Sequence, residues 1–106
     1  MSWIFLLIAS VFEVVWAFSL KASDGFSRLT PSLITVSTMI ASFWFLALAM
    51  RSLPLGTAYA MWTGLGAVGA FTAGVVFLNE ALTLERLMAI SLIVAGLVLL
   101  KLSATA

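Results

Sequence analysis

Glu13 is the residue of this sequence whose surroundings point most directly to chemistry. It stands in the segment SVFEVVWAF, residues 10–18, inside a long apolar stretch. A charged side chain at the centre of a membrane helix costs about 2.5–3.5 kcal/mol on insertion scales, and no basic residue lies at matching depth. One interpretation is a structural carboxylate, neutralised by protonation or by a partner. The favoured interpretation is a functional group that binds a proton or a cation.

Two neighbours share the helix face of Glu13. Ser10 precedes it by three residues and Trp16 follows it by three, and this spacing brings side chains together on a helix. Tryptophans near a membrane surface often serve as anchors, which is the interpretation that suits Trp3. Trp16 lies too deep for an anchor. We therefore predict that Trp16 belongs to a site around Glu13 and that Ser10 supports it.

The second apolar stretch carries a stripe of hydroxyl groups. Thr35, Thr38 and Ser42 are spaced i, i+3 and i+7, so they lie along one helix face. Hydroxyls in membrane helices often bond only to their own backbone, and this is the favoured interpretation of both threonines. Ser42 lies near mid-depth and is a candidate site residue, with Thr38 as a candidate support.

The third apolar stretch combines aromatic rings with glycines. Tyr59, Trp62 and Gly66 follow one helix face, which suits either a binding site or an interfacial belt. Thr63, next to Trp62, is a further candidate support. Three glycines follow closely: Gly64, Gly66 and Gly69. They favour close helix packing through small residues or a hinge, because kinks occur at glycine groups.

The fourth apolar stretch has small residues at helical spacing and no acid near its middle. Ala89 and Gly96 lie seven apart, and Ser91 and Ala95 lie four apart. Small residues at such spacing permit two helices to approach closely. We predict that this stretch forms a contact between two copies of the chain. Lys101, at its end, is expected to reach the membrane surface.

Composition restricts the class of protein. Of the 106 residues, 64% are hydrophobic and 8% are charged, and the mean hydropathy is +1.26. A soluble domain of this size could not bury so much apolar surface, so the sequence predicts an integral membrane protein. With no cysteine and no histidine, we expect no disulfide, metal site or cofactor. No nucleophile–base set is present, so an enzyme is not expected. The net charge of +1 suggests no nucleic-acid partner.

Four stretches are long enough to span a bilayer, since a span needs roughly 20 apolar residues. They cover approximately residues 2–21, 31–50, 57–78 and 84–102, within a single transmembrane domain over residues 1–106. Thr30 is expected to cap the second span, with Pro31 as its first helical residue. Thr83 is expected to cap the fourth, with Glu85 in its first turn. The fold class is therefore an all-α membrane protein of four transmembrane helices.

The basic residues of the loops hardly determine the orientation of the chain in the membrane. Arg51 and Lys101 lie on one side of the predicted bundle, and Lys21, Arg28 and Arg86 lie on the other. Positive loops favour the cytoplasmic side, but two against three is a weak bias. Either this bias still selects one orientation, or the chain inserts both ways and pairs with its inverted copy.

These motifs resemble the small multidrug resistance family. The resemblance runs from end to end and rests on the glutamate in the first of four short helices, on GFSRLTPS at residues 25–32, and on GTAYAMWTGLGAVGA at residues 56–70. The segment FEVVWAFSLK at residues 12–21, with a tryptophan three residues after the glutamate, is similar to the guanidinium exporters of the family. Multidrug members typically have a small residue in place of Trp16. The segment WTGLGAVGA and Lys101 also fit the guanidinium exporters.

The resemblance implies a fold, a partner and an activity. The fold would be an antiparallel, dual-topology homodimer in a prokaryotic cell membrane, as one interpretation of the charge tally suggests. The activity would be proton-coupled antiport that exports guanidinium and small substituted guanidinium or alkylammonium cations. The site implied by the matching motifs consists of Glu13, Trp16, Ser42, Tyr59 and Trp62.

Two alternatives remain at this point. One is a broad exporter of quaternary ammonium and other drug cations within the same family, although Trp16 argues against a roomy pocket. The other, of a different class, is a non-transporting structural or regulatory membrane subunit. That second alternative leaves Glu13 without a role.

Overall fold

Four helices make up the computed structural model, which describes residues 1–103. They are α1 (Ser2–Ala22), α2 (Leu29–Ala49), α3 (Leu55–Phe77) and α4 (Leu84–Ser103). Each is long and apolar enough to cross a membrane. The prediction of an all-α fold with four helices of spanning length is confirmed.

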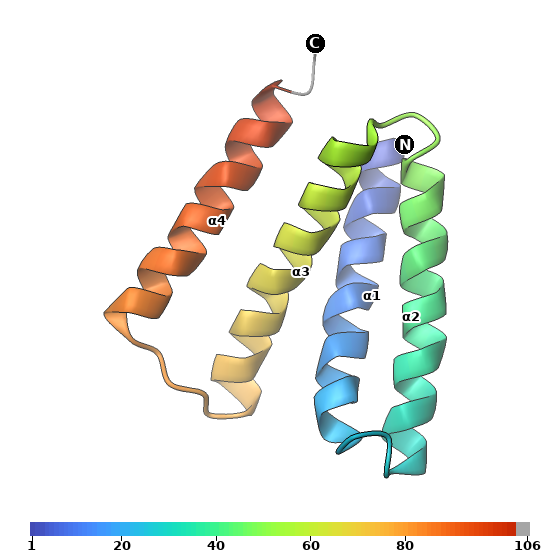
Figure 1. Cartoon of the computed structure of the whole chain (residues 1–106), viewed down its shortest axis with the longest axis vertical. Coiled ribbons are helices and arrows are strands. Elements are labelled where there is room, and N and C mark those ends of the chain that lie inside the picture. Colours follow the sequence, from blue (N-terminus) through green and yellow to red (C-terminus); the bar gives the residue numbers. More distant parts are fainter. Residues whose placement is uncertain (104–106) are drawn as a thin grey trace.

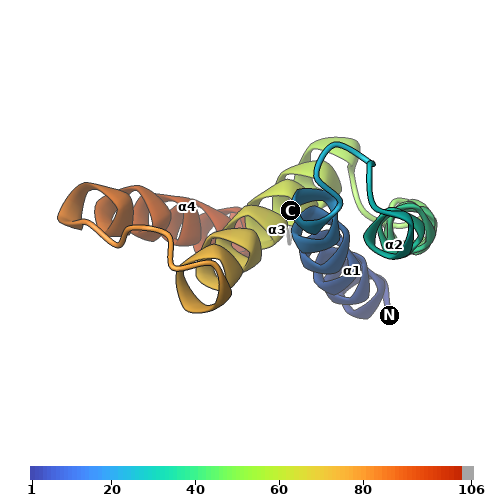
Figure 2. The same cartoon turned by 90° about the horizontal axis from the view of Figure 1, so that it is seen from below.

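The first three helices form one unit, and α4 lies at its flank. In Figure 1, α1 stands between α2 and α3, and the end view of Figure 2 shows α4 on the far side of α3. The main packing joins α1 to α2 and α1 to α3, and α4 packs along α3. At the end of α4, the ammonium of Lys101 lies 4.6 Å from the centre of the Trp3 ring on α1.

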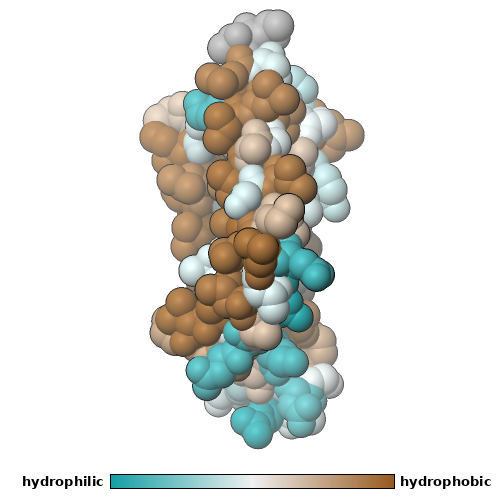
Figure 3. Space-filling model, turned by 90° about the vertical axis from the view of Figure 1, so that its left-hand side faces the viewer, coloured by the Kyte–Doolittle hydropathy of each residue, from teal (hydrophilic) through white to brown (hydrophobic). Residues whose placement is uncertain are grey.

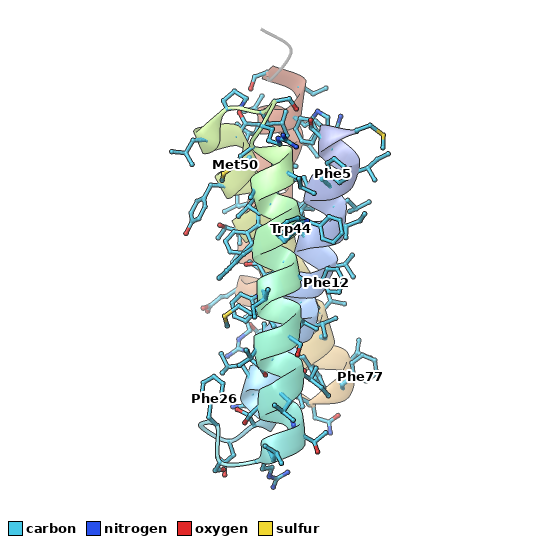
Figure 4. All side chains as sticks on the ribbon, turned by 90° about the vertical axis from the view of Figure 1, so that its right-hand side faces the viewer. Phe5, Phe12, Phe26, Trp44, Met50 and Phe77 are labelled. Atoms are coloured by element: carbon cyan, nitrogen blue, oxygen red, sulfur yellow. The ribbon has the colours of Figure 1, made fainter. Side chains whose placement is uncertain are left out.

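The buried hydrophobic residues lie in this three-helix unit. They are Leu6 and Ala9 of α1, Leu46 and Ala49 of α2, and Ala58, Met61 and Trp62 of α3. Phe5 and Phe12 lie along α1 (Figure 4). The ring of Phe45 on α2 contacts both, with its centre 6.1 Å from that of Phe5 and 5.9 Å from that of Phe12. By contrast, α4 has no buried residue, and its surface is largely hydrophobic (Figure 3). The unit therefore holds its own core, whereas α4 offers an apolar surface for other contacts.

The helix ends differ from the sequence prediction by one or two residues. The prediction that Thr30 caps α2 was wrong, because the helix begins at Leu29 after an extended Arg28. Pro31 is then the third helical residue, which is tolerated because the first N–H groups of a helix have no intrahelical acceptor. At α4, Thr83 accepts a hydrogen bond from the backbone N–H of Arg86 at 3.2 Å, as predicted for a cap.

Candidate functional site

The carboxyl group of Glu13 lies against the backbone of α3. Glu13 is half-buried on α1, and its Cγ, Cδ and Oε1 atoms occupy the space in which a side chain at Gly66 would stand. Gly66 is therefore the position at which α3 leaves room for the carboxyl group. Gly66 follows Trp62 by four residues, so it lies one helical turn along the same face. The absence of a side chain at 66 thus brings the acid of α1 next to the aromatic face of α3.

Two polar atoms on α1 are buried without a hydrogen-bond partner among residues 1–103. They are Oε1 of Glu13, an acceptor, and Nε1 of Trp16, a donor. Leaving a buried polar group unpaired costs about 1–3 kcal/mol. One face of α1 therefore presents a carboxylate oxygen and an indole N–H, one turn apart, that a ligand could use as hydrogen-bond partners. Among the described residues, no three carboxylates form a group that could hold a metal ion.

A chain of hydrogen bonds joins three helices beside this carboxylate. The indole Nε1 of Trp62 donates to Ser42 Oγ at 3.0 Å, and Ser42 Oγ donates to the carbonyl oxygen of Ala9 at 2.7 Å. Ser42 is fully buried. Ala9 precedes Glu13 by one helical turn, so its carbonyl lies in the turn that carries the acid. Since Ser42 has one hydroxyl proton, that proton is used on Ala9 in this conformation and does not reach the carboxylate.

Aromatic rings surround the indole of Trp62. The ring of Tyr59 lies 5.6 Å away, tilted by 49°, and the ring of Phe43 lies 5.7 Å away, edge to face. Trp62 itself is buried, whereas the side chain of Tyr59 is 52% exposed. Trp62 is therefore in contact with both Ser42 and Tyr59. Glu13, on α1, lies against Gly66, which is one helical turn from Trp62 along α3. Trp16 is half-buried on α1, three residues after Glu13.

The three residues predicted to support the site have different surroundings. Ser10 is buried and donates to Leu6 of its own helix at 2.9 Å. Thr38 donates to the carbonyl of Ile34 at 2.6 Å, as expected for a hydroxyl bonded to its own helix. Thr63 is exposed and lines a groove between α3 and α4. A supporting role for these three residues stays a prediction.

Three glycines near the middle of α3 each lie against a side chain of another helix. A side chain at Gly64 would overlap Leu97 of α4, and one at Gly69 would overlap Val14 of α1. Together with Gly66 against Glu13, these contacts agree with close packing through small residues. The helix is continuous from Leu55 to Phe77, and a hinge at Gly64, Gly66 and Gly69 stays a prediction.

The predicted contact face of α4 is bare in the single chain. Ala89, Ser91, Ala95 and Gly96 are all exposed, and a side chain at Gly96 would meet nothing within 4 Å. Ser91 donates to Leu87 of its own helix at 2.7 Å. The face is therefore open to a second molecule, and the contact between copies stays a prediction.

Two features of the site were not expected from the sequence. The carbonyl of Ala9 accepts the hydroxyl of Ser42, and Phe43 packs its edge on Trp62. Every residue has a backbone carbonyl, so the residue type does not mark Ala9 as an acceptor. Its spacing of four residues from Glu13 would still have placed it one helical turn from the acid. The side chain of Phe43 is 48% exposed. Phe43 is a large apolar residue directly after Ser42 in a spanning segment, so the sequence alone would place its side chain against lipid.

Comparisons with known proteins agree over nearly the whole chain. Residues 1–93 match the family model described as Small Multidrug Resistance protein. A protein of Escherichia coli (strain K12) named "Guanidinium exporter" is 60% identical over 103 residues, covering 97% of this chain and 98% of its own. Proteins with the same name from Salmonella typhimurium and Citrobacter freundii are each 58% identical, covering 98% and 97% of this chain and 99% and 98% of their own.

Proposed function

The chain belongs to the small multidrug resistance family, and on that premise we propose that it is a guanidinium exporter coupled to protons. Its four apolar helices and its exporter relatives make it a multi-pass membrane protein. We place it in the plasma membrane of a prokaryote. The observation that carries the proposal is the carboxylate oxygen of Glu13, which is buried without a hydrogen-bond partner among residues 1–103 and occupies the space that Gly66 leaves open.

Guanidinium fits the groups that the site offers. It is planar, stays charged, and presents paired N–H donors that suit a carboxylate. Oε1 of Glu13 is an acceptor without a partner among residues 1–103, so it can take a donor from the cation. Flat aromatic faces attract cations through their π electrons, and Trp16, Tyr59 and Trp62 supply such faces. The same features admit small substituted guanidinium and alkylammonium cations.

A single carboxylate can couple cation to proton. It binds a proton or the cation, but it cannot hold both well, so each expels the other. If only the loaded states change access across the membrane, a proton gradient drives the cation outward. Glu13 supplies this shared carboxylate. The hydrogen bonds from Trp62 through Ser42 to Ala9 hold the indole of Trp62 relative to the turn of α1 that carries Glu13.

We further propose that two copies assemble antiparallel, each contributing one Glu13. The weak charge bias of two basic residues against three supports insertion in both directions. The bare face of α4 supports a contact between copies through Ala89, Ser91, Ala95 and Gly96. In an antiparallel pair, exchanging the conformations of the two subunits converts an inward-open state into an equivalent outward-open one. This is the two-chain form of the inverted repeats found within many transporters.

The test is transport in proteoliposomes with an imposed pH gradient. Guanidinium and a tetraalkylammonium ion of similar hydration are compared on the same preparation, with protein-free vesicles as the control. The proposal expects gradient-dependent guanidinium flux that exceeds the tetraalkylammonium flux. Equal or larger flux of the tetraalkylammonium ion would favour the broad drug exporter, and no flux of either cation would favour a non-transporting subunit.

A further inference from the structure

Two adjoining hollows mark the surface of α1 and α3 on the side of Lys21. The first, of about 380 Å³, is lined by Val14, Val15, Phe18, Ser19, Ala73 and Phe77. The second, of about 300 Å³, shares Phe18 and Ala73 with the first and adds the charged side chains of Lys21 and Glu80. We call the pair the α1–α3 groove. Along α1 it runs from Val14 to Lys21, about 10 Å at 1.5 Å per residue.

The groove changes from apolar to charged as it approaches the helix ends. Its first hollow begins one residue after Glu13, inside the spanning segment, and has almost wholly apolar walls. Its second hollow reaches Lys21, the last residue but one of α1, and Glu80, which follows the end of α3. Because these helix ends lie where a span meets water, the groove has the polarity profile of a lipid: an apolar body and a charged head.

The carboxylate of Glu80 is folded back toward the groove by a defined turn. Asn79 adopts a left-handed backbone, with φ of 56°, a conformation that asparagine tolerates better than most residues. The backbone N–H groups of Leu78 and Glu80 both donate to the carbonyl of Gly74, at 3.0 and 3.1 Å. The Glu80 carboxyl group then lies over Gly74, where a side chain would overlap it.

At Val15, the first hollow reaches the face of α1 opposite to Glu13. Ile4, Leu7, Val11 and Val15 are all exposed and follow one face of the helix into the first hollow. Residues two apart on a helix point to nearly opposite sides, so Val11 and Val15 face away from Glu13. An acyl chain that lies along Val15 in the first hollow is therefore turned away from the face of α1 that carries Glu13.

We propose that the α1–α3 groove binds one phospholipid whose zwitterionic headgroup carries a primary amine. The Lys21 ammonium attracts the phosphate, and the Glu80 carboxylate accepts hydrogen bonds from the amine. An acyl chain lies in the hollow of Val14, Phe18, Ala73 and Phe77. A choline headgroup has no N–H to donate to Glu80, and a headgroup with only negative charge meets Glu80 unfavourably. The groove thus selects for the amine rather than for lipid in general.

The experiment uses the full-length protein in phosphatidylcholine vesicles that contain a trace of phosphatidylethanolamine with a photoreactive acyl chain. After illumination, labelled residues are mapped by mass spectrometry. We expect labels on residues 14–18 and 73–77. We also expect unlabelled phosphatidylethanolamine to compete about two- to fivefold better than phosphatidylcholine or phosphatidylglycerol, which is the range of an exposed ionic contact. Equal competition by the three lipids, or labels spread evenly over the four helices, would overturn the proposal.

Charge variants with matched controls test the headgroup directly. Glu80→Gln should remove the preference for the amine lipid, and Lys21→Gln should lower labelling by both zwitterionic lipids. The controls are Glu85→Gln and Arg28→Gln, which change exposed charges that do not line the groove; they should behave as the unaltered protein. Unchanged lipid preference in Glu80→Gln would overturn the proposal.

Filling the groove provides a test that is independent of charge. Ala73 lines both hollows, so Ala73→Phe should reduce labelling for every headgroup. If this variant fails to fold, the charge variants at the exposed Lys21 and Glu80 still decide. A crosslink between two copies of the chain through Val15 or Phe77, which line the first hollow, would place a second protein molecule in the groove and would overturn the lipid assignment.

Discussion

The unit of α1, α2 and α3 and the flanking helix α4 are built from similar apolar residues but pack differently. In the unit, Ser10 and Thr38 bond back to their own helices, but the chain from Trp62 through Ser42 to Ala9 crosses between helices. In α4, Ser91 bonds back to its own helix and no residue is buried. The comparison teaches that hydroxyls and glycines of equal type join helices in one region and leave a surface open in the other.

Glycines at equivalent mid-helix positions give the strongest test of this comparison. Gly66→Leu should reduce guanidinium transport to background, because the new side chain would occupy the space of the Glu13 carboxyl group. An added Cβ at Gly96 would meet nothing within 4 Å, so Gly96→Leu should leave each subunit folded and should lower transport only through weaker association of copies. Transport in proteoliposomes and size in detergent measure the two effects. If both variants transported equally well, the distinction between the unit and α4 would fail.

Serines provide the next comparison. Ser42→Ala leaves the buried N–H of Trp62 without its acceptor, so thermal unfolding in detergent should show a loss of about 1–3 kcal/mol. Ser91→Ala, on the exposed face of α4, should change stability by about 0.5 kcal/mol or less. Guanidinium affinity should fall in the first variant, because the wall of the site is no longer fixed to the turn of Glu13. Equal stability of the two variants would contradict a tie across helices.

Tryptophans test which aromatic residue controls selectivity. Trp16→Gly removes an indole beside Glu13 and should lower the ratio of guanidinium to tetraalkylammonium transport, since a cation–π contact is worth about 0.5–2 kcal/mol. Trp44→Gly, on the exposed surface of α2, serves as the control and should leave the ratio unchanged. Currents from both cations under one pH gradient give the ratio. An unchanged ratio in Trp16→Gly would make Trp16 a structural residue.

Orientation gives the smallest expected effect. Two lysines inserted beside Arg51 should shift a two-way mixture toward one orientation, because positive loops stay on the cytoplasmic side. Transport should fall by roughly the fraction of copies left without an inverted partner, and co-expression of an oppositely biased chain should restore it. A side-specific tag at the C-terminus reports the mixture. A tag found on one face in the unaltered protein would contradict insertion in both directions.

Sequence patterns were sufficient for the helices, and they placed several candidate site residues on shared helix faces. Apolar length predicts four helices because a bilayer demands about 20 residues per span, and helical spacing placed Tyr59, Trp62 and Gly66 on one face. The details that escaped prediction depend on contacts between helices. Nothing in the sequence says that Gly66 receives Glu13 in particular, or that the proton of Ser42 goes to a backbone carbonyl, because both follow from how α1, α2 and α3 pack.

Helix ends escaped prediction for a more local reason. The first turn of a helix tolerates residues that lack a hydrogen-bonding N–H, so Pro31 is as acceptable at the third helical position as at the first. The capping signals of Thr30 and Thr83 look alike in sequence. Only Thr83 forms the capping bond, with the N–H of Arg86.

The most direct measurement of the central claim is proton release on addition of guanidinium to purified protein in weakly buffered detergent solution. If Glu13 holds either a proton or the cation, the unaltered protein should acidify the solution in a saturable way, and its apparent guanidinium affinity should fall as the pH falls. Glu85→Gln, at an exposed acid in the first turn of α4, should release protons like the unaltered protein, and Glu13→Gln should release none. Proton release from Glu13→Gln equal to that of the unaltered protein would contradict the exchange of proton and cation at this carboxylate.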